Sequence, residues 1–277
     1  MKLFWAVFFV FWAIAAFVVS WISPSMGWWF PSEAGSPLGQ QIDDLFYLIL
    51  WIVSITFVGT HIALGYVLFR GAKSGDSKAW FSHGSHSLEV IWTIVPAGIL
   101  LFIALYQMDV WAQYRIIDNF PEDARNQPIA EVTARQFEWR IRYPAPDRVF
   151  KGQKDIERWL AQPEPGDLYT VNDLRAPTGR PVMFYLRTQD VQHSFFAPDL
   201  RVKQDALPGL VIPVWFEAIK GGEYSLLCAE LCGWGHYKMK ARIVAESELD
   251  LAAYWSELQA SQFDDGFSTE DSSEEAE

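Results

Sequence analysis

The sequence contains little cysteine, few basic residues and few charged residues of any kind. Two cysteines among 277 residues cannot support a disulfide-rich scaffold. Lysine and arginine number 22 against 34 acidic residues, a formal net charge of −12, which excludes a general nucleic-acid-binding surface. Charged residues make up 20% of the chain and hydrophobic residues 51%, so disorder over most of its length is excluded. The roles of the apolar residues and of the two cysteines must therefore be inferred from their positions in the sequence.

Long apolar runs are confined to the first 110 or so residues. They span Leu3–Ile22, Leu45–Phe69 and Leu88–Met108. Because about 20 helical residues cross the ~30 Å hydrocarbon core of a bilayer, each run is long enough to be a membrane-spanning helix. The first run, residues 1–22, is also compatible with a signal peptide, but it is longer than a usual apolar signal region and no clear cleavage site follows it. We therefore predict a hairpin over residues 45–108, preceded by a further helix or a signal peptide.

The short loops indicate the orientation of this hairpin. The loop 70–87 carries Arg70, Lys73 and Lys78 against one acid, whereas the segment 23–44 carries three acids and no base. Basic loops stay in the cytoplasm, so the loop 70–87 is predicted to be cytoplasmic. The chain then crosses outward, and the domain 109–260 is expected outside the cytoplasm.

The soluble part has a pattern typical of an all-β fold. Short β-type runs separated by turn signals predict a sandwich or barrel, with strands over Ile129–Arg135, Phe137–Tyr143, Pro181–Arg187, Leu210–Ala218, Glu223–Cys228 and Met239–Val244. Asp155–Ala161 is predicted to be a helical insertion, and Leu249–Leu258 a closing helix capped by Ser247. The acidic tail, residues 261–277, is expected to be disordered.

The most informative stretch runs from Cys228 to Met239 and reads CAELCGWGHYKM. It holds both cysteines, one of the five histidines and one of the five methionines. Thiolate, imidazole and thioether are ligands that copper prefers, and His193 is the other histidine of the soluble part. A disulfide and a Cys2His2 zinc site are alternatives. However, so small a disulfide ring stabilises little, and zinc has no use for the methionine, so we favour copper.

Several motifs together resemble subunit II of the cytochrome c oxidases. The pattern Cys-x-Glu-x-Cys-Gly-x-x-His-x-x-Met over Cys228–Met239 resembles the family's CuA motif. Leu88–Pro96 resembles its second transmembrane helix. Asp190–Phe195 and Asp205–Gly209 resemble its first-ligand loop and the following turn, and Gln136–Trp139 stands where the family has an aromatic-rich strand.

The resemblance, which spans roughly residues 45–258, implies a cupredoxin-like barrel holding two coppers. The ligands it implies are Cys228 and Cys232 as bridging thiolates, His193 and His236 as one ligand to each copper, and Met239 and the backbone carbonyl of Glu230 as weak ligands. It also implies that the Glu230 side chain reaches a magnesium ion shared with subunit I.

The function implied by the resemblance is electron transfer in a haem–copper oxidase of the bacterial inner membrane. The multi-pass chain would place its domain in the periplasm, accept electrons from cytochrome c or a small copper protein, and pass them to the haem-containing subunit I. Dioxygen reduction would be coupled to proton pumping. Its partners would be subunit I, the other oxidase subunits and membrane lipid, with no nucleic acid. A CuA subunit of a nitric oxide reductase and, from another class, a membrane-anchored copper chaperone are the alternatives.

Two sites depart from the family pattern or rest on resemblance alone. Phe137 stands where relatives usually have a tryptophan as the electron-entry residue. Trp139, two residues along the same expected strand, should share its face and is the second candidate for entry. Arg140 and Arg142 add positive charge to a region that is often acidic. Glu89, at the cytoplasmic end of the third apolar run, resembles the mouth of a proton-uptake path.

Overall fold

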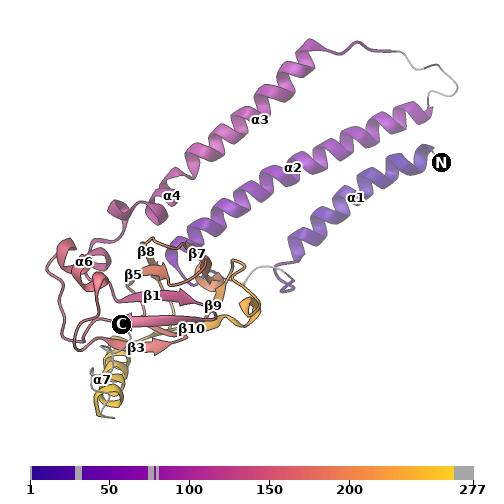
Figure 1. Ribbon diagram of the computed structural model, residues 1–277. Coiled ribbons are helices and arrows are strands. Elements are labelled where there is room, and N and C mark those ends of the chain that lie inside the picture. Colours follow the sequence, from indigo (N-terminus) through magenta and orange to yellow (C-terminus); the bar gives the residue numbers. More distant parts are fainter. Residues whose placement is uncertain (1, 29–32, 74–77, 79–80, 265–277) are drawn as a thin grey trace. The chain divides into compact units, whose positions relative to one another are not determined.

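The computed structural model describes residues 2–28, 33–73, 78 and 81–264 (Figure 1). The described residues fall into two compact units. One comprises residues 1–32 and 41–111, and the other comprises residues 33–40 and 112–277. We describe each unit by itself.

The first unit is helical. Helices α1 (Lys2–Ile22), α2 (Pro37–Lys73) and α3 (His86–Tyr106) each contain a stretch long and apolar enough to cross a membrane. Helix α3 is followed by the short α4 (Met108–Arg115), which takes up the last residue of the predicted third span. Phe17 and Trp21 of α1 pack on Trp51 of α2, with ring centroids 5.8 and 4.8 Å apart.

Helix α2 begins eight residues before the predicted start at Leu45 because its first two turns are polar and escape a hydropathy argument. Pro37 occupies the first helical position, and the hydroxyl of Ser36 accepts a hydrogen bond from the Gly39 amide at 2.9 Å. Both features are typical of a helix start. Ser36 also donates to the carbonyl of Leu200 at 2.8 Å, a contact within the second unit, to which residues 33–40 belong.

The second unit is a β-sandwich with short helices. One sheet has the strand order β3-β2-β1-β5-β8 and the other β4-β10-β9-β6-β7. The pairs β1–β5 and β4–β10 are parallel, and the remaining pairs are antiparallel. The strands are β1 (Ala130–Arg135), β2 (Glu138–Tyr143), β3 (Leu168–Val171), β4 (Asp173–Pro177), β5 (Pro181–Thr188), β6 (His193–Ala197), β7 (Val202–Ala206), β8 (Ile212–Glu217), β9 (Gly222–Cys228) and β10 (Lys240–Glu246).

The core between the sheets is aromatic on the side that supports the site. Phe184 of β5 packs on Phe195 of β6 with ring centroids 4.8 Å apart, and Trp139 of β2 meets Phe195 edge-on at 5.7 Å. All three side chains are fully buried. The predicted fold class, apolar N-terminal helices followed by a cupredoxin-like β domain, is confirmed.

The described helices of this unit are η1 (Ile117–Asn119), α5 (Glu122–Asn126), α6 (Gln153–Ala161), η2 (Pro198–Leu200), η3 (His236–Lys238) and α7 (Glu248–Asp264). Two of them, α6 and α7, were predicted and have shifted ends, and the four shorter ones were not predicted. Ser247 caps α7 by accepting the Asp250 amide at 3.2 Å. Helix α7 continues past the predicted domain end at residue 260, and the tail from residue 265 lies outside the described residues.

Candidate metal centre

Two neighbouring strands of one sheet and the loop after them bring the cysteines and His193 together. His193 opens β6 and Cys228 closes β9, and these strands pair so that Phe195 lies opposite Cys228. The other predicted ligands lie on the loop 229–239 that joins β9 to β10. The amide of Cys228 donates to the carbonyl of Met239 at 3.2 Å, so the two ends of the ligand loop are held together.

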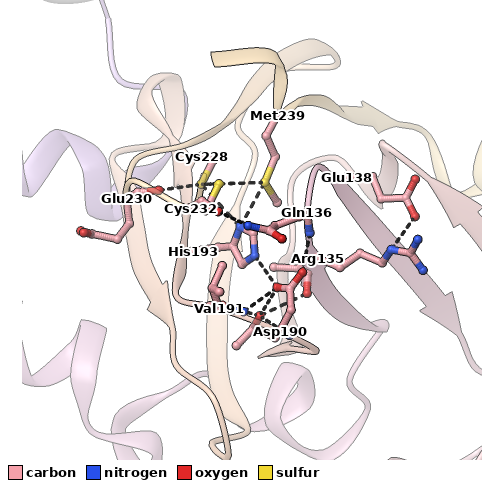
Figure 2. A network of polar contacts seen from close by, with 12 residues as sticks. Arg135, Gln136, Glu138, Asp190, Val191, His193, Cys228, Glu230, Cys232 and Met239 are labelled. Carbon is pink, nitrogen blue, oxygen red and sulfur yellow. Dashed lines mark hydrogen bonds and ion pairs between the residues drawn. The ribbon is translucent and has the colours of Figure 1, made fainter. Parts of the chain in front are cut away.

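In Figure 2 the side chains of His193, Cys228, Cys232 and Met239 lie close together. One atom each of His193, Cys228 and Cys232 lies within 4.8 Å of the others. The two sulfur atoms are 3.9 Å apart, about twice the ~2.05 Å of a disulfide, so the cysteines are free thiols in this structure. His236 Nδ1 lies 3.6 Å from Cys232 Sγ, and Met239 Sδ lies 3.1 Å from His193 Nδ1.

Glu230 presents two different groups. Its backbone carbonyl oxygen lies 3.2 Å from Cys228 Sγ. Its carboxylate points away from the sulfur atoms, as Figure 2 shows. The main chain of Glu230 therefore belongs to the sulfur cluster, whereas the side chain is free to serve a different contact.

The carboxylate of Asp190 orients His193, a role that the ligand pattern did not predict. Asp190 Oδ1 lies 2.8 Å from His193 Nε2, which leaves Nδ1 facing the sulfur atoms. The Asp190 carboxylate also accepts the amides of Gln136 and Val191 at 2.8 and 2.7 Å. Burial would raise the pKa of Asp190, but these amides and His193 hold it below its usual value. The sequence carries a signal for this contact, an acid three residues before the histidine.

The two thiols differ in acidity. Burial disfavours the thiolate at Cys228, but contacts with His193 and with the backbone of Glu230 outweigh burial and lower the pKa of this thiol. At Cys232, burial and the neighbouring charge of Cys228 raise the pKa. Because thiols ligate metals as thiolates, binding of a cation to this pair releases protons and strengthens as pH rises.

Phe137 packs directly on the ligand loop. Because Phe137 and its neighbour Gln136 lie so close, the loop has room only for glycine at positions 233 and 235. A Cβ atom on Gly235 would stand 2.5 Å from the Phe137 ring, and one on Gly233 would stand 2.7 Å from Gln136 Nε2. Gly233 also has a φ of +134°, a conformation that other residues rarely adopt. The side-chain amide of Gln136 donates to the carbonyl of Cys232. The turn before β2 is thereby fixed to the loop that carries the ligands.

Phe137 and Trp139 differ in local structure and in burial. Phe137 lies in the turn between β1 and β2, so the alternation of a strand does not extend to it. Trp139 lies within β2 and is fully buried against Phe195. A buried side chain offers no surface to a donor protein, so Trp139 could serve electron entry only from within the core.

The positive charge expected of Arg140 and Arg142 is largely neutralised. Arg142 is buried between Glu131 and Asp167, at 2.8 and 3.1 Å. Arg140 pairs with Glu138 at 2.8 Å. Glu89 is exposed in the first turn of α3, where a helix start favours a carboxylate.

Comparisons with known proteins match both the membrane part and the soluble part of the chain. The family model "Cytochrome C oxidase subunit II, transmembrane domain" matches residues 23–110, and "Cytochrome C oxidase subunit II, periplasmic domain" matches residues 130–247. The alternative cytochrome c oxidase subunit 2 of Bradyrhizobium diazoefficiens is 31% identical over 244 residues, covering 84% of each chain. Subunit 2 of Thermostichus vulcanus is 27% identical over 262 residues, covering 82% of this chain and 78% of that protein.

One solved structure with a similar chain is the periplasmic domain of cytochrome oxidase subunit II of Bradyrhizobium japonicum. It is 22% identical, has a TM-score of 0.39, and covers 48% of this chain and 93% of that one. The family models together match both the membrane segments and the soluble domain. The chain belongs to the cytochrome c oxidase subunit II family, as a membrane-anchored subunit of a haem–copper oxidase with a periplasmic domain.

Proposed function

We propose that the periplasmic domain holds a dinuclear copper centre and that the chain carries electrons from a periplasmic donor to the haem subunit. The observation that carries this proposal is the pair of free thiols 3.9 Å apart, with two imidazole nitrogens and a thioether around them. This donor set fits copper, because it is soft and includes a methionine that zinc sites do not use. The free thiols argue against the disulfide alternative.

In this proposal Cys228 and Cys232 would hold both ions through their thiolates, His193 and His236 would each bind one ion, and Met239 and the Glu230 carbonyl would be weak ligands. A bound copper pair supplies one-electron chemistry with the charge shared over both ions. The chain contributes a rigid frame: β6, β9 and the pinned ligand loop hold the donor atoms in place before binding. Burial of Cys232, Met239 and His193 keeps water away from the sulfur atoms.

The fold weighs against the copper-chaperone alternative. A thioredoxin-like chaperone needs alternating βαβ units, whereas the soluble unit is a sandwich of two five-stranded sheets. The relatives compared above are named as oxidase subunits, which weighs against the nitric oxide reductase alternative. We therefore propose dioxygen reduction, coupled to proton pumping, as the reaction that the complex performs.

Two carboxylates complete the proposal. The Glu230 side chain, which points away from the sulfur cluster, would bind magnesium shared with the haem subunit; metal analysis of the complex should find magnesium beside copper. Glu89, exposed at the start of α3, would admit protons at the cytoplasmic end of a span; proton-uptake rates on vesicles test this role. The chain would lie in the bacterial inner membrane with three spans.

The decisive test is the Cys228→Ser variant of the full chain loaded with copper. The wild type should hold two coppers and show a purple colour and an electron spin signal delocalised over both ions. The variant should lose that signal because one bridge is missing. Ser225→Ala, an exposed change on the same strand, is the control. A variant that keeps the delocalised signal, or a wild type with one copper, contradicts the proposal.

A further inference from the structure

The ligand loop carries large apolar side chains on its outer surface. Leu231, Trp234 and Tyr237 are 78%, 79% and 67% exposed, whereas Cys232 and Met239 of the same loop are buried. Among the described residues of the soluble unit, Trp234 is the only tryptophan whose side chain is largely exposed to solvent. Exposed aromatic residues gathered at one place mark contact surfaces for other proteins. We call Leu231, Trp234, Tyr237 and Lys238 the loop patch.

Trp234 is held in contact with the residues beside the metal centre. Its indole meets the Phe137 ring edge-on, with centroids 5.2 Å apart and planes at 70°. Phe137 in turn lies directly on Gly235, the residue before the ligand His236. The exposed indole is thus two residues from Cys232 and two from His236 along the chain. Electron tunnelling weakens steeply with distance, so a ring in this position shortens the gap between a docked donor and the centre.

The one charged residue of the loop patch is a base, Lys238. The Lys238 ammonium lies 5.5 Å from the ring centroids of both Trp234 and Tyr237, and it has no ion pair within the described ranges 2–28, 33–73, 78 and 81–264. Beside Phe137, Arg135 and Arg140 share the single carboxylate of Glu138, at 3.3 and 2.8 Å. Complementary charge on a partner therefore means an acidic group opposite Lys238.

We propose that Trp234 is the electron-entry residue of this chain and that the loop patch docks a small electron-carrier protein. The carrier presents an apolar edge of its redox centre to Trp234 and an acidic group to Lys238. The indole absent from position 137 is in effect supplied from the ligand loop itself, with Phe137 as its support. This inference rests on the proposed electron-transfer function and specifies where the electron enters.

The test uses the complete oxidase with Trp234→Ala, Trp234→Phe and Lys238→Gln. The donors are two reduced soluble c-type cytochromes, one acidic and one basic, and the readouts are kcat/KM and the visible copper spectrum. Trp234→Ala should lower kcat/KM about tenfold, as loss of a central interface aromatic does, with the copper spectrum unchanged. Trp234→Phe should recover part of the rate. Lys238→Gln should slow the acidic cytochrome and not the basic one.

Two controls separate this inference from the proposed function. Leu249→Ala removes an equally exposed apolar side chain on α7 and should leave kcat/KM unchanged. A small inorganic reductant, which needs no docking surface, should reduce the Trp234→Ala oxidase at the wild-type rate. Wild-type rates with both cytochromes in Trp234→Ala overturn the inference and leave the copper proposal standing. Absence of the copper spectrum in the wild type overturns both.

Discussion

At the scale of single residues, the orientation of His193 depends on a carboxylate. Asp190 binds Nε2 and is itself held by two backbone amides, so the ring presents Nδ1 to the sulfur atoms. Partners of this kind fix the tautomer and raise the basicity of a ligating imidazole. Asp190 thus belongs to the metal centre although it does not face the sulfur atoms.

Asp190→Asn should weaken metal binding while leaving the fold intact. Loss of an outer partner of a ligating histidine typically lowers metal affinity about 10- to 100-fold. Copper titration of the reduced protein in detergent measures the affinity, and the nitrogen coupling of His193 in the spin signal measures the ring. Glu248→Gln, an exposed acid on α7, is the control. Unchanged affinity and coupling would show that Asp190 acts only as a surface charge.

The ligand residues themselves were predictable because five of the six lie within twelve residues, where spacing alone indicates a shared site. The role of Asp190 and the burial of Trp139 were not. Both depend on how the turn before β2 and the start of β6 meet across the sandwich, which no local pattern records.

At the scale of elements, six of the ten strands in the described residues were predicted, and β3, β4, β6 and β7 were missed, although β6 reads HSFFA and is largely buried. All six predicted strands are present with shifted ends. Strands β3 and β4 are four and five residues long, and β7, at a sheet edge, reads VKQDA with little apolar content. Such strands form because a neighbour supplies hydrogen bonds, so their own residues carry a weak signal.

Helix α6 gives a test of pH dependence. Asp155 accepts the Lys151 amide at 2.9 Å and pairs with Arg148 and Arg158. The hydrogen bond from Lys151 is the main cause that lowers the pKa of the Asp155 carboxyl below 3.8. A carboxyl whose pKa is lower in the folded state stabilises the fold above its unfolded value. That contribution is lost as the pH falls through the folded value.

Asp155→Asn should therefore loosen α6 at pH 7 and make no difference well below pH 3.8, where the wild-type carboxyl is also protonated. Hydrogen exchange of the amides of residues 151–162, compared between variant and wild type at the same pH, measures this. Glu157→Gln on the exposed side of the same helix is the control. A difference that persists at low pH would point to packing rather than charge.

At the scale of the whole molecule, the packing of α1 on α2 bears on how often the chain crosses the membrane. Ala6 and Ala13 are buried, and a Cβ atom on Gly65 of α2 would stand 2.5 Å from Val10 Cγ2. Small residues at such contacts let membrane helices approach closely. The family model for the membrane part begins at residue 23, after α1.

We expect α1 to remain in the mature protein as a third span. Intact-mass measurement of the purified subunit should include residues 2–22. Gly65→Leu should destabilise the α1–α2 contact by roughly 1–3 kcal/mol, the usual effect of overpacking. Unfolding by detergent titration measures this change. Gly59→Leu, where an added Cβ meets nothing within 4 Å, is the control. A mature chain starting after Ile22 would contradict this expectation.

The sequence by itself determined the apolar spans, the strand-rich soluble domain and the ligand loop. Each of these depends on residues close together in the chain: hydropathy over about 20 residues, alternation over a strand, and ligand spacing from Cys228 to Met239. Only the tertiary structure decided that Asp190 holds His193, that Trp139 is core, and that Trp234 rests on Phe137. Those contacts join distant segments through sheet pairing and close packing, and such long-range contacts leave no periodic trace in the sequence.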